Sequence, residues 1–152
     1  MKFNLNQQDL QKSLNYCQGV IEKRSTLPIL SNVLVEAKDK KLKITATDLD
    51  IVFIQNISNI EILEEGETTT SCSIMYDIVR KFNNEKKINF NLVNENKINL
   101  ESDKSSFNLN CLKATEFPIT EENFKDNEFS LNSKKLLKLL NKCKFSISND
   151  ET

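Results

Sequence analysis

The chain has 152 residues and a net charge of −1, and 38% of its residues are hydrophobic against 28% charged. These values are typical of one globular domain. The near-neutral balance excludes a protein drawn to nucleic acid by its overall charge, so any basic surface must be local. With no histidine and two glycines, the sequence also excludes Ser-His-Asp and Cys-His catalysis and cannot supply a P-loop or a dinucleotide-binding turn.

No stretch of the sequence predicts a secretion signal or a membrane span. The N-terminus turns polar within four residues, and no apolar run approaches the roughly 18 residues that a spanning helix needs. The four cysteines are scattered, without a C-x-x-C pair: Cys17, Cys72, Cys111 and Cys143. We therefore expect buried, reduced thiols in a cytoplasmic protein, with no metal site and no cofactor.

Two helices are predicted in the first 125 residues. The first runs from Gln7 to Cys17, because apolar residues recur there at i, i+4 and i+7 and Asn6 is a suitable N-cap. The second runs from about Ser73 to Phe82. Its apolar residues are expected to form one stripe with two neighbours beside it: Ile74, Ile78 and Phe82, flanked by Met75 and Val79.

The remaining segments alternate between apolar and polar residues with a period of two. This pattern is clear in residues 42–46, 88–92, 98–100 and 107–111, and it predicts strands with one buried face. The short polar breaks KDKK, NEN and SDKS predict tight antiparallel hairpins. The order strand, helix, three strands therefore occurs twice, in about residues 1–60 and 66–112.

The start of the chain is repeated near its end. Residues 128–147 match residues 2–21 at 9 of 20 positions, at an offset of 126. The segment 114–127 between them carries Pro118 and several acids, which is typical of a linker: Glu116, Glu121, Glu122 and Asp126. We therefore predict a tandem array, with one domain in residues 1–124 and the first strand and helix of a truncated second domain in residues 125–152.

Several stretches of the chain, in order, resemble the bacterial sliding clamp, the beta subunit of DNA polymerase III. They are MKF, RSTLPILSNVLVEA, LKITATDLDI with its T-D-L signature, GETTTSCSIMYDIVRKF, FPIT and KFSISNDET. The resemblance covers essentially all 152 residues. It implies an α+β DNA-clamp fold, in which a doubled βαβββ unit places antiparallel sheets outside and two helices on one face. A clamp protomer has three such domains, so the chain is expected to be an N-terminal fragment.

The resemblance implies a non-catalytic processivity factor. Two full-length copies would form a homodimeric ring that encircles double-stranded DNA without reading its sequence. The expected partners are DNA, the DNA polymerase III alpha subunit and the clamp loader, within a holoenzyme that also carries 3′–5′ exonuclease activity. The expected location is the cytoplasm, with no membrane partner. The client-peptide cleft of the family lies between domains two and three, outside this chain.

The repeated helix supplies the main candidate DNA contacts. Residues 133–144 contain five lysines and no acid, and three of the lysines recur every four residues: Lys134, Lys138 and Lys142. An ordinary solvated lysine face is the alternative interpretation. The repeat and the resemblance favour a DNA-facing stripe, because phosphate contacts hold DNA without reading bases.

The resemblance adds five candidate DNA contacts in the first domain: Lys12, Lys23, Arg24, Arg80 and Lys81. Arg24 matches a family arginine in the loop after the first helix. Simple solvation is the alternative for the lysines at 12 and 81, and a helix C-terminal dipole contact is the alternative for Arg80. The sequence departs from some clamps at the start of the second helix, where Ser73 replaces a basic residue.

The last strand of the first domain resembles the edge that pairs with domain three of the other protomer. Its interface candidates are Lys104, Ser106, Phe107 and Leu109. An unpaired edge invites another strand. The alternative for Phe107 and Leu109 is a place in the domain core, because alternation can turn them inward while their neighbours face outward.

Two other functions remain open on the residues alone. Asp48 and Asp50 could join Asp77 and Glu61 in a metal-dependent nuclease site, although aspartates are also common in turns. A protein-binding scaffold without a nucleic-acid role is the other alternative. Its binding would not weaken steeply with salt, whereas phosphate contacts would.

Overall fold

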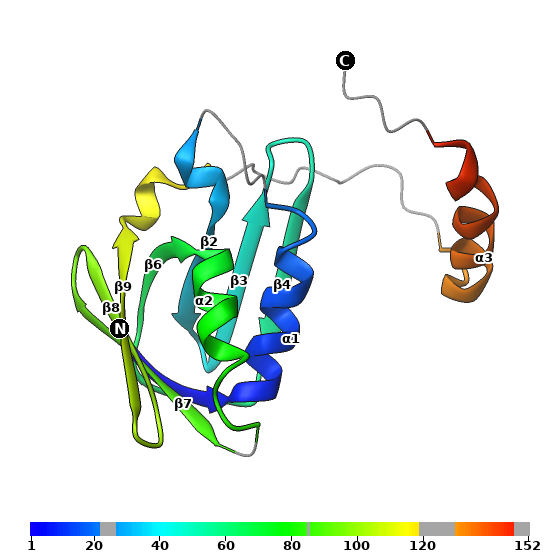
Figure 1. The fold of residues 1–152 in the computed structure, drawn as a ribbon. Coiled ribbons are helices and arrows are strands. Elements are labelled where there is room, and N and C mark those ends of the chain that lie inside the picture. The colour runs from blue at the N-terminus through cyan, green and yellow to red at the C-terminus, as the bar shows by residue number, and fades with distance from the viewer. Residues whose placement is uncertain (22–26, 85, 119–129, 148–152) are drawn as a thin grey trace. The chain divides into compact units, whose positions relative to one another are not determined.

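The computed structural model describes residues 1–21, 27–84, 86–118 and 130–147 (Figure 1). The chain divides into two units, Met1–Thr120 and Glu121–Thr152. Within the described residues, the first unit holds all the strands, and the second holds one α-helix followed by a short 3-10 helix. The first unit is therefore the part of the chain that has a core of its own.

The first unit has the predicted order of elements in each half, with one strand more than expected. Its first half comprises β1 (Lys2–Asn6), α1 (Gln7–Cys17), the 3-10 helix η1 (Pro28–Ser31), β2 (Asn32–Lys38), β3 (Lys41–Thr47), β4 (Val52–Ile57) and β5 (Ile60–Glu64). Its second half comprises β6 (Gly66–Ser71), α2 (Cys72–Val79), β7 (Lys87–Asn94), β8 (Lys97–Ser102), β9 (Ser105–Leu112) and the 3-10 helix η2 (Ala114–Glu116). The additional strand is β5, which continues β4 after a two-residue break and pairs with β1.

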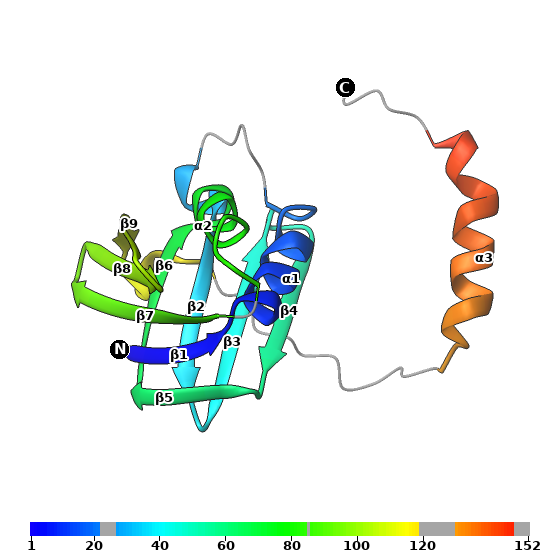
Figure 2. The same ribbon diagram turned by 60° about the horizontal axis from the view of Figure 1, so that its bottom comes forward.

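The two halves exchange their first strands. The strand order is β4-β3-β2-β6-β9-β8-β7-β1-β5, and neighbouring strands are antiparallel. β1 therefore lies beside β7 of the second half, and β6 lies beside β2 of the first. Figure 2 shows β1, β5 and β7 running across the direction of β2 and β3. This exchange makes the doubled unit one intertwined domain rather than two separable halves.

Threonine side chains reinforce the junction between β6 and β9, where strands β4-β3-β2-β6 meet strands β9-β8-β7-β1-β5. β6 and β9 pair through two residue pairs, Thr69 with Leu112 and Thr70 with Cys111. The hydroxyls of Thr68 and Thr69 also donate to the Leu112 carbonyl, at 3.4 and 3.3 Å, and the Thr70 hydroxyl donates to the Asn110 carbonyl at 3.0 Å. These side-chain bonds satisfy buried hydroxyls and hold β9 where the backbone ladder is short.

The two helices pack against each other on one side of the strands (Figures 1 and 2). The prediction for α1 is confirmed, with its stripe buried: Leu10, Leu14 and Cys17. Asn6 occupies the N-cap position with extended backbone, but its side chain makes no capping hydrogen bond. By contrast, the Ser71 hydroxyl caps α2 by accepting from the Ile74 backbone N–H at 3.5 Å.

The predicted apolar stripe of the second helix is wrong. Cys72, Met75 and Val79 face the core, whereas Ile74 is 56% exposed. Apolar residues are spread over more than one face of α2, and the face at i, i+3 and i+7 from Cys72 is the one that packs against the core. Phe82 is buried, but it lies after the last residue of α2.

The predicted hairpins are confirmed. Asp39 and Lys40 join β2 to β3 with φ of 50° and 59°, the backbone of a type I′ turn. Asp103, at φ of 53°, lies in the turn between β8 and β9. Left-handed backbone at non-glycine residues matches the right-handed twist of the strands that these turns connect.

The start of the predicted linker belongs instead to the first unit. Ala114 lies in η2, and both Ala114 and Phe117 are buried against Leu34. These two residues anchor the end of β9 to the outer side of β2. The rest of the predicted linker, from residue 119 to residue 127, lies outside the described residues.

The second unit contains α3 (Ser133–Cys143) and the 3-10 helix η3 (Lys144–Ser146). The Asn132 side chain caps α3 by accepting from the Lys135 backbone N–H at 3.2 Å, and no residue of α3 is buried. Residues 130–132 are not a strand, and residues 128–129 of the predicted strand lie outside the described part of the chain. No described helix is long and apolar enough to cross a membrane.

Candidate nucleic-acid interface and sheet edge

The lysine stripe of α3 corresponds to the solvent-facing side of α1. At the offset of 126 residues, Lys134, Lys138 and Lys142 align with Gln8, Lys12 and Tyr16. All three of these α1 residues are exposed. The leucines at 136 and 140 instead align with two residues that are 2% and 0% exposed in the first unit: Leu10 and Leu14. The packing of α1 therefore separates the apolar and basic sides of the repeated helix.

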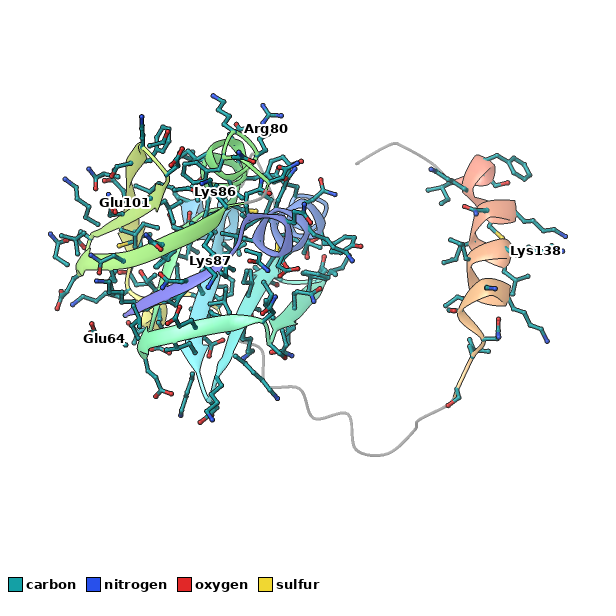
Figure 3. The ribbon with its side chains drawn as sticks, turned by 90° about the horizontal axis from the view of Figure 1, so that it is seen from below. Glu64, Arg80, Lys86, Lys87, Glu101 and Lys138 are labelled. Carbon is teal, nitrogen blue, oxygen red and sulfur yellow. The ribbon has the colours of Figure 1, made fainter. Side chains whose placement is uncertain are left out.

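The basic side of α3 is dense in positive charge. α3 holds four lysines and no acid, and Lys138 projects from the middle of the helix (Figure 3). Lys142 lies in the last turn, where a cation interacts favourably with the helix dipole. Lysines four residues apart on one face repel each other weakly, and an anion laid along the helix relieves that repulsion. The arrangement suits a polyanion such as a phosphate backbone.

The candidate cations of the first unit differ in their surroundings. Lys12 is exposed on α1, and Lys81 is exposed just after α2. Arg80, the C-cap of α2, pairs with Asp77 at 3.1 Å and lies 5.9 Å from the centre of the Tyr76 ring (Figure 3). Arg80 is thus already engaged within its own helix. Lys23 and Arg24 lie outside the described residues.

A polar groove of about 430 Å³ runs between α1 and the end of β4. Asp9, Lys12, Ser13 and Tyr16 line one wall, and residues 55–59 line the other. The Tyr16 ring rests on Phe53, with 5.9 Å between ring centroids, and is 49% exposed. Sequence reasoning missed Tyr16 as a surface residue of this helix. Its spacing of four residues from Lys12, and its alignment with Lys142, are the signals that could have found it.

The free edge of β9 carries the interface candidates. β9 pairs with β8 along its length but with β6 through two residue pairs, so residues 105–109 have no strand on that side within the described structure. Phe107 is 38% exposed and meets Phe82 edge-on, with 5.7 Å between centroids. Leu109 is 5% exposed and lines a pocket of about 370 Å³ together with Ile74 and Leu112. The edge thus presents one aromatic ring beside an apolar hollow.

The other two edge candidates lie on different surfaces. Lys104 is exposed in the turn before β9. The Ser106 hydroxyl donates to Glu101 at 3.1 Å and accepts from the Asn99 side chain at 2.8 Å, on the opposite face of the strand from Phe107. The predicted alternation along β9 is confirmed, because Leu109 faces the core while Ser106 faces outward.

The acidic residues of the nuclease alternative are engaged separately. Asp48 accepts from the backbone N–H groups of Asp50 and Ile51, at 3.1 and 2.7 Å, and so closes the turn between β3 and β4. Asp77 pairs with Arg80, and Glu61 accepts from an asparagine side chain on β1. Within the described residues, no three metal-binding side chains come together. The geometry favours the turn interpretation of the aspartates.

Three of the four cysteines are buried free thiols, as predicted: Cys17, Cys72 and Cys111. The prediction is wrong for Cys143, which is exposed because it lies on α3, where no residue is buried. Burial raises the pKa of the Cys111 thiol above its ordinary value of 9.0, against a smaller opposing effect of a hydrogen bond with Thr68. Cys111 therefore stays neutral and unreactive at physiological pH.

The family model of the DNA polymerase III beta subunit, N-terminal domain, matches residues 1–121. The beta sliding clamp of Caulobacter vibrioides is 31% identical over 154 residues, and that of Escherichia coli K12 is 30% identical over 151 residues. Among solved structures, Caulobacter crescentus pol III beta aligns with a TM-score of 0.92 at 32% identity. The DNA polymerase III subunit beta from Pseudomonas aeruginosa aligns with a TM-score of 0.90 at 30% identity.

The alignments cover almost all of this chain and a minority of each similar protein. The two clamp sequences align with 100% and 99% of the chain, and each alignment covers 41% of the relative. The two structures align with 100% of the chain, which covers 40% and 41% of theirs. The chain thus spans about two fifths of the length of the proteins it matches.

Proposed function

The chain belongs to the DNA polymerase III beta subunit family, and we propose that it is the N-terminal part of a sliding clamp that holds the replicative polymerase on duplex DNA. In this proposal residues 1–124 form the first clamp domain, and residues 125–152 begin the second. The observation that carries the proposal is the repeated helix. α3 repeats α1 and places lysines at positions that lie on the solvent-facing side of α1.

The proposed mechanism is a tether rather than a reaction. Lysines on the helix side attract phosphates without reading bases, so the protein holds any duplex and can move along it. The candidate contacts are Lys12, Lys23, Arg24, Arg80, Lys81, Lys134, Lys138 and Lys142. Enclosure keeps the protein on DNA, while the individual contacts stay weak enough to slide. The function is non-catalytic and uses no cofactor.

Ring closure would use the free edge of β9. A strand from a second copy of the complete protein can add to residues 105–109, because their backbone groups on that side face no other described strand. Phe107 would be the exposed anchor, and its ring packs edge-on against the ring of Phe82. The hollow beside Leu109 would take an apolar side chain of the partner. Lys104 and Ser106 would lie at the rim, where charge tunes association more than affinity.

The names of the relatives, beta sliding clamp and DNA polymerase III subunit beta, support a role beside that polymerase. We propose that the complete protein is a homodimer in the cytoplasm, that it is placed on DNA by a clamp loader, and that it binds the polymerase III alpha subunit within the exonuclease-associated holoenzyme. None of these steps needs a membrane.

The test is processive synthesis. Primer extension on a long single-stranded circle would use the alpha subunit, the clamp loader, ATP and an excess of trap DNA, with and without the complete polypeptide read to its stop codon. We expect products many times longer when the polypeptide and the loader are both present. Equal product lengths with and without the polypeptide would contradict the proposal.

A further inference from the structure

The two equivalent helices differ sharply in charge. On the solvent-facing side of α1, Lys12 is the one cation, and Gln8, Asn15 and Tyr16 are neutral. Asp9, three residues before Lys12, offsets its charge, so α1 is neutral in total. The same positions in α3 hold lysines instead of Gln8 and Tyr16, and a lysine also replaces Asp9. α3 holds four lysines and no acid, a net charge of +4.

The second helix of the first unit does not make up the difference. Asp77 and Arg80 form a salt bridge at 3.1 Å within α2 and its C-cap, so their charges cancel locally. The Arg80 guanidinium also lies 5.9 Å from the centre of the Tyr76 ring. Lys81, just past the end of α2, is the one cation there that the salt bridge leaves uncompensated.

We propose that α3 is the principal phosphate-binding helix of the three that the structure describes, and that α1 is a nearly neutral surface past which the DNA moves. This inference rests on the proposed function. Affinity for a duplex depends on the number of phosphates that a protein neutralises, through release of condensed counterions. A helix of charge +4 therefore contributes most of the electrostatic affinity, and a neutral helix contributes little. Inside a ring, the duplex would lie off-centre, toward α3.

The chemistry of the α1 surface fits this lesser role. Amide side chains such as Gln8 and Asn15 can bond phosphate oxygens directly or through water, but they release no counterions. Such contacts form and break without a large electrostatic cost. The charged α3 would thus keep the protein on the DNA, and the neutral α1 would let the DNA slide past. A ring of uniformly basic helices would not combine these two properties.

The experiment measures the salt dependence of duplex binding by the 152-residue chain and its variants. The probe is a fluorescently labelled duplex of about 20 base pairs, and its anisotropy is followed from about 50 to about 200 mM NaCl. The test variant carries K134Q, K138Q and K142Q. The matched control removes three candidate cations of the first unit, with K12Q, R80Q and K81Q. Far-UV circular dichroism confirms that both variants keep their helices.

We expect the slope of log K against log salt, which is negative, to become shallower in the test variant. Its magnitude should fall by about 2.7, which is 0.9 for each phosphate that the protein no longer neutralises. The control should lower it by less than about 1, because Arg80 is paired already and Lys12 lies beside Asp9. A third variant, Gln8→Lys, gives α1 one lysine of the α3 pattern. It should increase the magnitude of the slope by about 0.9.

The possible results separate the two proposals. A control variant whose slope falls as far as that of the test variant would overturn the unequal division while leaving DNA tethering intact. A wild-type chain whose binding does not change with salt would count against DNA contact itself. Binding to vesicles of anionic lipid without binding to the duplex would assign α3 to a membrane surface and overturn both.

Discussion

The substitution Gly66→Ala tests how closely Met1, just before β1, packs against Gly66 at the start of β6. Gly66 begins β6 with φ of +156°, a backbone conformation that residues with a Cβ rarely adopt. A Cβ there would lie 2.9 Å from the Met1 Cβ. Met1 is 5% exposed, so its side chain has little room to move away.

The magnitude follows from two costs and one gain. The backbone strain costs about 1–3 kcal/mol, and crowding in a packed core costs about 1–3 kcal/mol. Restricting the unfolded chain returns about 0.4–1 kcal/mol. We therefore expect Gly66→Ala to lower the free energy of unfolding by about 1–5 kcal/mol, a large part of the typical 5–15 kcal/mol of a domain.

The assay is urea unfolding of the chain, followed by far-UV circular dichroism. Gly19→Ala is the matched control, because a Cβ at Gly19 would meet the Tyr16 carbonyl oxygen at 3.5 Å, an ordinary contact, and no left-handed φ is required. The control should stay within about 0.5 kcal/mol of wild type. Equal stability of the two variants would refute the claim that Met1 and Gly66 are packed together under backbone constraint.

Four further substitutions test three separate features. Thr70→Val removes a buried hydroxyl that donates to the Asn110 carbonyl at 3.0 Å, and urea unfolding should show a loss of stability of about 1–2 kcal/mol. Thr45→Val removes a buried hydroxyl with no described partner and should be neutral or stabilising. A larger loss of stability at Thr45 than at Thr70 would contradict this account of the buried hydroxyls. The raised pKa of Cys111 means that folding favours the neutral thiol, so its contribution to stability is complete below about pH 9 and falls above that pH. Cys111→Ala should therefore lose less stability than wild type as the pH rises above about 9, and equal losses would contradict the assignment. Phe107→Ala in the complete polypeptide should weaken self-association at least tenfold by analytical ultracentrifugation, or about 1.4 kcal/mol; an unchanged dimer would remove the free edge of β9 from the proposed interface.

Features set by neighbouring residues could be predicted from the sequence. α1 was predicted with its correct bounds, because the spacing of Leu10, Leu14 and Cys17 indicates which side of the helix is buried. The hairpin at Asp39 and Lys40 was also predicted, since two polar residues between alternating runs favour a type I′ turn. Local periodicity is sufficient in both cases.

Features set by distant residues could not be predicted in this way. The exchange of β1 and β6 between the halves depends on pairing between strands that lie far apart in the sequence, which no local pattern records. The buried side of α2 depends on packing, because the spacing of Ile74 and Ile78 is as regular as that of Met75 and Val79, and Ile74 lies on the surface. Phe117 looked like part of a linker because its burial comes from packing on the distant β2.

The candidate site divides in the same way. The lysine stripe of α3 was visible in the sequence, because its spacing and the repeat both lie on one helix. The engagement of Arg80 with Asp77 and Tyr76, and the position of Tyr16 at the groove beside β4, required the structure. The unequal charge of equivalent helices became interpretable once the solvent-facing side of α1 was known.

The most direct test of a sliding clamp is topological. The complete polypeptide, read to its stop codon, would be loaded with a clamp loader and ATP onto nicked circular DNA, and the complex would be isolated by gel filtration. The circle would then be cut once, and the amount of protein that stays with the DNA would be measured again. We expect retention on the circle and release after the cut, because a ring slides off a free end. Retention on the linear DNA would show direct affinity and would contradict the sliding clamp.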